Sequence, residues 1–406
     1  MANFYKAVAL IFSYAGVQLF SKALSLGVMY TLAFWVGDGV FGYISLAQAV
    51  FMSCLVFFGF NLQGIFVRYY TERRWSEIVN SVFFIYSGLL VLVFFASAVI
   101  FFFFKEHQYL VWFALLPVAG FLGGVSVSYT VYSRSMRWFW RYAFSELCRP
   151  LSLVVLVSFL WFLGRPDLVP QFYVVSLVFG GGVIFFLVAI KTRFGEKYKT
   201  ISKDSVSSFC FPLFFSQVMS LSNGYSDRFV LAFFVSMEDL GKYGKAYLVG
   251  TALGMLFDSL MMLWWPYVIS KKDSFFVLLF PKVKRAYMVT VFLSFLMLAS
   301  LVFVRWFGFA LLPVVEVSLV LVAAFFARVG YQVFVPVLNT YDRTRVSAKI
   351  SFYGAMVGLA LNFALIPVYG IYGAAYATWG AFLAFSALAY LETIKVFYGY
   401  KNETRV

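Results

Sequence analysis

The chain has 406 residues, of which 63% are hydrophobic and 12% are charged. Soluble proteins carry about 25% charged residues, so this composition excludes a soluble globular protein and indicates an integral membrane protein. The net charge of +15 would suit a nucleic-acid-binding protein. However, the basic residues lie mainly in short segments between apolar runs, so we expect no nucleic-acid partner and interpret the charge as a topological signal.

Twelve apolar segments are predicted to cross the bilayer, which takes about 20 residues of helix. The first six lie near residues 7–35, 40–66, 79–104, 110–132, 148–163 and 169–190. The second six lie near residues 208–235, 244–269, 287–304, 310–336, 350–366 and 371–391. The sequence therefore predicts an all-α integral membrane protein with about twelve transmembrane helices. We expect an N-terminal lobe at 1–190, a basic cytoplasmic linker at 191–207 and a C-terminal lobe at 208–406.

The distribution of lysine and arginine predicts the orientation. With the N-terminus placed in the cytoplasm, nearly all loop cations fall on the cytoplasmic side. The opposite side holds only Lys105, Arg165, Lys242, Lys245 and Arg305. Cytoplasmic loops carry the excess of Lys and Arg, so we expect both termini to be cytoplasmic. The first segment contains Lys22 and has no short apolar core with a cleavage site, so we expect a retained helix rather than a signal peptide.

The first helix carries a polar stripe in which Tyr14, Gln18, Lys22 and Ser25 share one face. Lys22 is too deep to reach the interface easily, so we expect it to face a wet cavity. Gln18 is either a second cavity residue or a hydrogen-bonding contact between helices. In the second helix, Gln48 is the corresponding cavity candidate.

The segment from Tyr132 to Pro150 interleaves arginines with aromatic residues. Arg134, Arg137 and Arg141 alternate with Trp138, Phe139, Trp140 and Tyr142. This spacing predicts a short helix lying on the membrane surface; an alternative is a recognition surface for anionic lipid headgroups.

The seventh helix has a polar face like that of the first helix. Asn223 and Asp227 lie on one polar face with Ser216 and Ser220, and Arg228 is adjacent. The eighth helix carries Tyr247 and a Gly250-x-x-x-Gly254 pattern that favours close helix packing. These polar residues are further cavity candidates.

Three more charges lie inside predicted helices: Asp258 in the eighth, and Glu316 and Arg328 in the tenth. We expect Arg328 to line the cavity. Asp258 and Glu316 are candidates for coupling to H⁺ or Na⁺, because a low-dielectric site favours protonation of a carboxylate. The alternative for Asp258 is a structural ion pair with Arg228 or Lys22. We expect no metal and no other cofactor.

The two halves of the chain contain similar motifs in the same order. Gly42-Tyr43 corresponds to Gly241-Lys242-Tyr243, and the pair Arg137 and Arg141 corresponds to Arg345 and Lys349. With six spans in each half, this order predicts a parallel repeat.

Two motifs resemble a known transporter family. The first is Asp227-Arg228-Phe229-Val230-Leu231 followed by Leu240 to Tyr247, and the second runs from Leu361 to Thr378 through Pro367-Val368-Tyr369-Gly370. Both are similar to segments of the O-antigen and capsule repeat-unit flippases, the polysaccharide-transport branch of the multidrug/oligosaccharidyl-lipid/polysaccharide (MATE-like) exporters.

The resemblance implies two six-helix lobes around a central cavity lined by the first, second, seventh and eighth helices. It also implies a bacterial inner membrane, an undecaprenyl-diphosphate-linked oligosaccharide as cargo, and polysaccharide polymerase machinery as a partner. Lys22 and Arg228 would bind the diphosphate. The alternatives are an ion-coupled multidrug exporter and a membrane polymerase or glycosyltransferase. The short external loops disfavour an enzyme.

Overall fold

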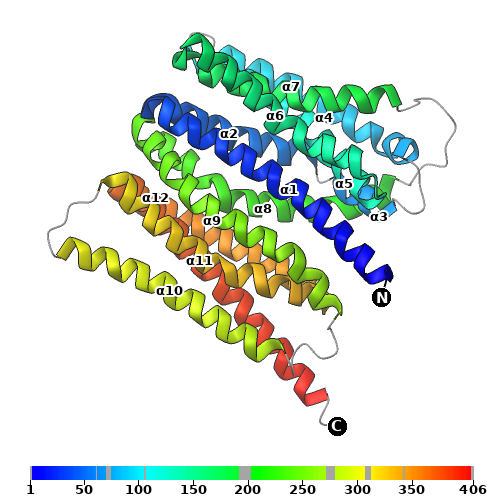
Figure 1. Cartoon of the computed structure of the whole chain (residues 1–406), viewed down its shortest axis with the longest axis vertical. Helices are drawn as coiled ribbons and strands as arrows, with labels where there is room; N and C mark the ends of the chain where they lie inside the picture. Colours follow the sequence, from blue (N-terminus) through cyan, green and yellow to red (C-terminus); the bar gives the residue numbers. More distant parts are fainter. Residues whose placement is uncertain are drawn as a thin grey trace. The chain divides into compact units, whose positions relative to one another are not determined.

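The computed structural model describes residues 2–60, 62–69, 75–104, 107–191, 203–270, 279–306, 312–341 and 343–403. These residues form mainly long α-helices (Figure 1), and none of them lies in a β-strand. The all-α prediction is therefore confirmed. Each helix follows from an apolar segment of the sequence, because backbone polar groups inside a bilayer must be paired within the helix itself.

By their internal contacts the residues form two compact units, Met1–Leu221 and Ser222–Val406. The division falls inside α8 (Lys203–Phe234). The first part of α8 packs in unit 1, where Phe214 stacks on Phe60 with 4.8 Å between ring centroids. Of the predicted linker, residues 192–202 lie outside the described residues, and Lys203 already begins α8.

Unit 1 is built around one central helix, α5 (Leu116–Ser135), which packs against α2, α3, α4, α6 and α7. The other α-helices that lie wholly in unit 1 are α1 (Ala2–Trp35), α2 (Asp38–Gly59), α3 (Gln63–Tyr69), α4 (Trp75–Phe104), α6 (Phe139–Leu163) and α7 (Val169–Lys191). The second predicted segment, 40–66, is divided into α2 and α3 at Phe60, where φ is +43°.

The prediction of a short surface helix between residues 132 and 150 is wrong. Helix α5 continues to Ser135, and α6 begins at Phe139 and runs through Pro150 to Leu163. Arg137 takes a positive φ of 59° in the turn between them, and this tight reversal leaves no room for a separate element. The aromatic residues interpreted as a surface anchor therefore belong mainly to the first turns of a full-length helix.

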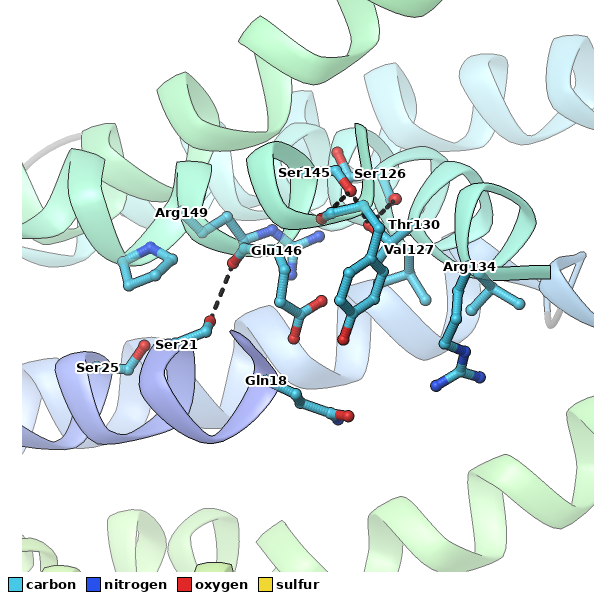
Figure 2. A pocket seen from close by; sticks show the side chains of 13 residues that line it. Gln18, Ser21, Ser25, Ser126, Val127, Thr130, Arg134, Ser145, Glu146 and Arg149 are labelled. Atoms are coloured by element: carbon cyan, nitrogen blue, oxygen red, sulfur yellow. Dashed lines mark hydrogen bonds between the residues drawn. The ribbon is translucent and has the colours of Figure 1, made fainter. Parts of the chain in front are cut away.

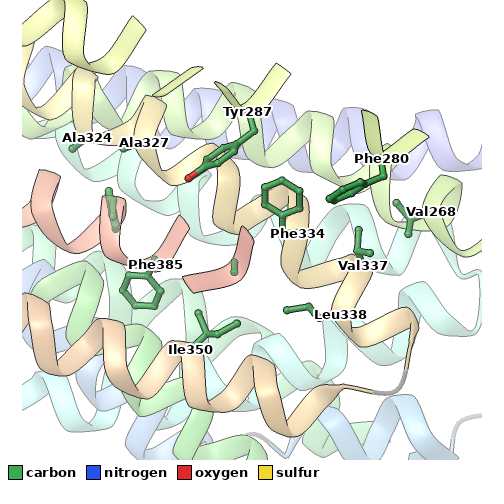
Figure 3. Packing of buried hydrophobic residues seen from close by; sticks show 12 residues of the cluster. Val268, Phe280, Tyr287, Ala324, Ala327, Phe334, Val337, Leu338, Ile350 and Phe385 are labelled. Carbon is green, nitrogen blue, oxygen red and sulfur yellow. The ribbon is translucent and has the colours of Figure 1, made fainter. Parts of the chain in front are cut away.

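Unit 2 is built around α11 (Pro313–Thr340), which packs against α9 (Met237–Ser270), α10 (Phe280–Trp306) and α12 (Thr344–Glu403). Figure 3 shows its apolar core, in which Tyr287 of α10 meets Phe334 of α11 with 5.2 Å between ring centroids. Gly250 and Gly254 of α9 lie against the ring of Phe325 in α11, so the close approach predicted from their spacing is confirmed.

The last helix, α12, folds back on itself at Gly370. This residue has φ 55° and ψ −129°, a conformation that glycine adopts without a steric penalty. Gly358 approaches Ala381, and Gly380 approaches Leu361, so the segments on either side of Gly370 run antiparallel. The predicted spans 350–366 and 371–391 are these two arms.

Nine helices among the described residues are long and apolar enough to cross a membrane, and one of them, Arg345–Tyr398, contains both arms of α12. Within the described residues, α8 carries Asp227 and Arg228, and α9 carries Asp258. The protein is thus a multi-pass membrane protein.

Candidate functional site

Unit 2 contains two buried charged residues in α8, Asp227 and Arg228, which are only 3% and 4% exposed. Oδ1 of Asp227 accepts the backbone N–H of Arg228 at 2.8 Å, and Oδ2 accepts the phenol of Tyr243 in α9 at 2.5 Å. The same phenol lies 3.5 Å from Oγ1 of Thr378 in α12. The carboxylate is thus hydrogen-bonded by its own helix and by α9, and it also interacts electrostatically with the Arg228 guanidinium.

The guanidinium of Arg228 lies between two aromatic rings. Its Cζ atom is 5.0 Å from the ring centroid of Tyr225 and 4.6 Å from that of Tyr247. Both contacts are within the range of cation–π attraction. The Nε and Nη1 atoms are buried and meet no hydrogen-bond acceptor among the described residues. A buried cation with two unused donors is an anion-binding group in chemical terms.

Asp258 of α9 lies beside Arg328 and Gln332 of α11. Its Oδ1 accepts the Nε2 donor of Gln332 at 2.5 Å and is 3.7 Å from Nη2 of Arg328. Both charged side chains are about one-third exposed, 34% each. Arg228, an expected structural partner of Asp258, forms no ion pair with it, and Arg328 does.

The two groups of charges in unit 2 are electrostatically connected. The positive charge of Arg328 interacts electrostatically with the phenol groups of both Tyr225 and Tyr247. The rings of these two tyrosines flank Arg228. Residues of four helices, α8, α9, α11 and α12, therefore contribute to one polar cluster. Its members predicted from the sequence are Arg228, Asp227, Tyr247, Arg328 and Asp258.

Asn223 and Glu316 have different positions. Oδ1 of Asn223 lies against Gly358 of α12, on the polar face of α8 predicted from the sequence. Glu316 is buried in the first turn of α11. It precedes Arg328 by about 18 Å along the helix, so the structure does not bring the two ion-coupling candidates Asp258 and Glu316 together.

Unit 1 has a polar pocket between α1, α5 and α6, with a volume of about 330 Å³. Gln18 of α1 and both Tyr142 and Glu146 of α6 line this pocket, and Figure 2 shows Gln18 near Glu146. Lys22 is half-buried on α1 and contributes positive potential at Glu146. Gln48 is half-buried on α2 and does not line the pocket.

The family model described as polysaccharide biosynthesis protein matches residues 7–272, well over half of the chain. The chain belongs to the polysaccharide biosynthesis protein family. The resemblance noted in its motifs is thereby confirmed at the level of the family. No curated protein matches the sequence.

Solved structures with the same fold include transporters of two kinds. The lipid II flippase MurJ in an inward closed conformation is 17% identical, with 95% of this chain and 88% of that chain covered and a TM-score of 0.68. The MATE multidrug transporter DinF-BH is 16% identical, with 96% and 95% covered and a TM-score of 0.64. A point mutant of the Vibrio cholerae MATE transporter VcmN is 14% identical, with 98% and 99% covered and a TM-score of 0.57. This member of the polysaccharide biosynthesis protein family thus has the MurJ/MATE transporter fold.

Several polar residues of this family member do not stand out in its sequence. Glu146 and Arg149 lie in the predicted surface segment, although a Glu-x-x-Arg pair next to an apolar run is a signal for a buried charge in a membrane helix. Tyr243 appears only as part of a motif. Gln332 carries no signal, because a lone glutamine in an apolar helix has no characteristic spacing.

Proposed function

We propose that this protein is a flippase for an undecaprenyl-diphosphate-linked oligosaccharide, the repeat unit of O-antigen or another surface polysaccharide. It moves the cargo from the cytoplasmic to the periplasmic leaflet of a bacterial inner membrane by alternating access. Both termini lie in the cytoplasm. The family description supports a role in polysaccharide biosynthesis, and the fold is shared with a lipid II flippase.

The chemistry of the cargo explains why such a protein needs buried polar groups. A diphosphate and several sugars cannot cross hydrocarbon unless protein groups replace their hydration. Arginine binds phosphate oxygens through paired hydrogen bonds, whereas lysine acts as a point charge. The polyprenyl chain is apolar and can stay in the lipid throughout.

One observation carries the proposal: Arg228 is buried with donors that no described residue satisfies. Leaving a buried donor unpaired costs about 1–3 kcal/mol, and charged groups inside membranes are retained mainly where they function. Tyr225 and Tyr247 hold the guanidinium plane from two sides. An anionic oxygen of the cargo would complete its hydrogen bonds.

The other candidates receive roles consistent with their positions. Lys22 supplies a second positive charge for the diphosphate. Gln18, Gln48, Asn223 and Tyr247 bind sugar hydroxyls, together with the aromatic side chains. Arg328 lines the path of the cargo while Asp258 and Glu316 couple transport to H⁺ or Na⁺.

The test is a binding comparison with purified full-length protein in lipid nanodiscs. We expect an undecaprenyl-diphosphate glycan to bind at least about tenfold more tightly than the same glycan on an uncharged lipid, a difference of about 1.4 kcal/mol. Arg228→Ala and Lys22→Ala should each remove that preference, and Lys22→Arg should keep part of it. Arg165→Ala is the matched control, because Arg165 is exposed and paired with Asp167 at 2.9 Å.

Equal affinity of the wild-type protein for the charged and uncharged lipids would overturn the proposal. Tight binding of a lipophilic cationic dye without binding of the diphosphate lipid would instead indicate a multidrug exporter. Incubation with the diphosphate glycan followed by mass spectrometry shows whether it is returned chemically unchanged, as expected of a transporter and not of a polymerase.

A further inference from the structure

The pocket of unit 1 is lined mainly by polar side chains, and many of these can accept hydrogen bonds from a ligand. It is formed by Gln18, Ser21 and Ser25 of α1, Ser126, Val127, Thr130, Val131 and Arg134 of α5, and Tyr142, Ser145, Glu146, Arg149 and Pro150 of α6. At about 330 Å³ it is at the lower end of the size range of ligand pockets. A single small ring fits this volume, whereas a whole repeat unit does not.

Most hydroxyl protons of the lining are already committed to main-chain carbonyl groups. The donor hydroxyls and their acceptors are Ser21 to Glu146 at 3.0 Å, Ser126 to Leu122 at 2.8 Å, Thr130 to Ser126 at 2.8 Å, Ser145 to Tyr142 at 3.0 Å, and Tyr142 to Tyr14 at 3.2 Å. A hydroxyl group has one proton and two lone pairs. These oxygens can therefore offer a ligand only their remaining lone pairs, one of which on Ser145 Oγ already accepts from Thr130 at 2.9 Å.

Two further acceptors belong to the same pocket. Oε1 of Gln18 is buried and meets no donor among the described residues. The carboxylate of Glu146 can accept several hydrogen bonds, and in Figure 2 it lies near the side chain of Gln18. These acceptors favour a ligand that brings several hydrogen-bond donors.

The charges around the pocket restrict the ligand further. Arg149, Lys22 and Arg134 all place positive potential at Glu146, which disfavours an ammonium or a guanidinium. A phosphate group brings no donors: Arg134 and Arg149 would attract it, but it would also meet the lone pairs of the lining and the carboxylate of Glu146. A neutral polyol supplies donors without either conflict.

We propose that this pocket binds one uncharged sugar ring, with Glu146 and Gln18 accepting hydrogen bonds from its hydroxyl groups and Arg134 donating to a ring substituent at the rim. The inference rests on the proposed function, in that the ring belongs to the cargo oligosaccharide. The pocket lies next to the turn between α5 and α6, which the sequence assigns to the cytoplasmic side. The first contact of the glycan with the protein would therefore occur here.

The experiment measures binding of soluble sugars to the full-length protein in nanodiscs by saturation-transfer NMR. The probes are the methyl pyranosides of glucose, galactose, mannose and N-acetylglucosamine, with inorganic phosphate as competitor. We expect at least one glycoside to bind saturably and phosphate not to displace it. Glu146→Gln should weaken that binding about tenfold or more, because it replaces a charged acceptor by a neutral one.

Gln18→Met is expected to test the site at little cost to folding. The Oε1 atom of Gln18 has no donor to lose among the described residues, so the variant should unfold at the same temperature as the wild type or above it and still bind the glycoside more weakly. Glu392→Gln is the matched control for charge, because Glu392 pairs with the exposed Lys395 on α12. It should bind as the wild type does.

Binding of none of the four glycosides, displacement by phosphate, or unchanged binding in both pocket variants would overturn the proposal. These probes carry neither lipid nor phosphate. Sugar binding that depends on Glu146 therefore supports the pocket even if the diphosphate preference of the proposed function fails, and the converse result separates the two claims equally well.

Discussion

The phenol of Tyr243 in α9 donates a 2.5 Å hydrogen bond to Oδ2 of Asp227 in α8, and both side chains are buried. This contact ties α8 to α9 beside the guanidinium of Arg228. A buried hydrogen bond to a charged group is more stabilising than one between neutral groups. The bond between Tyr243 and Asp227 therefore fixes the position of Asp227 and of the adjacent Arg228.

Removal of the phenol should destabilise the protein. We expect Tyr243→Phe to lower the free energy of unfolding by about 1.5–3 kcal/mol, because Asp227 loses a donor inside the protein. Tyr353→Phe, at a residue that is 56% exposed, should change it by less than about 0.5 kcal/mol. Unfolding of the purified proteins in detergent, followed by circular dichroism, provides the measurement. Equal stability of the two variants would show that the bond to Asp227 contributes nothing.

Alanine substitutions of Gly254 in α9 and Gly27 in α1 should change the stability of the protein in opposite directions. A Cβ atom on Gly254 would lie 2.5 Å from Cε1 of Phe325, whereas one on Gly27 would meet nothing within 4 Å. We expect Gly254→Ala to destabilise by about 1–3 kcal/mol through overpacking. Gly27→Ala should stabilise by up to about 1 kcal/mol through helix propensity. An unfolding temperature of Gly254→Ala equal to or above that of the wild type would refute the close packing at Gly254.

The pair of Asp258 and Arg328 tests ion coupling. We expect Asp258→Asn to lower transport and to flatten its dependence on pH at an unchanged protein level, because the variant cannot exchange a proton at this position. Asp239→Asn is the control, since Asp239 lies at the start of α9 and is bonded to Ser236 and Lys242. Transport assays in vesicles across a pH series provide the measurement.

A normal pH dependence in Asp258→Asn would assign this carboxylate a structural role only. In that case its contribution is the ion pair with Arg328 and the hydrogen bond from Gln332. Such a partly exposed pair is expected to contribute less than about 1 kcal/mol.

The membrane orientation can be tested by reporter fusions. We expect fusions at Lys6, Lys199 and Lys401 to report the cytoplasm, and fusions at Gly164 and Asp239 to report the opposite side, from the distribution of Lys and Arg. An external reporter at Lys199 would contradict the assignment of two lobes that both begin inside.

The positions of the helices were largely predictable, because apolar segments of fixed length are the dominant signal in a membrane protein. The segments 350–366 and 371–391 emerge as the arms of α12, and Gly370 supplies the turn. The interval from Tyr132 to Pro150 was not predictable in this way. Its arginines resemble a surface segment, yet the turn at Arg137 is short enough for α6 to start at Phe139.

The site was predictable residue by residue only where charges stand out in an apolar background. Arg228, Asp227 and Arg328 are examples, and the structure brings them into one cluster with Tyr247. Their partners depend on tertiary contacts: Tyr243 reaches Asp227 across two helices, and Gln332 reaches Asp258. Periodicity along one helix contains no information about such pairs. The acceptor-rich pocket was hidden for the same reason, since it is shared by three helices.

The central claim is that the protein moves lipid-linked repeat units across the membrane, and the most direct measurement is where those units accumulate. In cells that lack the protein, we predict that undecaprenyl-diphosphate-linked repeat units build up on the cytoplasmic leaflet and that surface polysaccharide is lost. The wild-type gene should restore both, and Arg228→Ala, produced at the same level, should restore neither. Normal surface polysaccharide in those cells, with no build-up of lipid-linked units, would contradict the account.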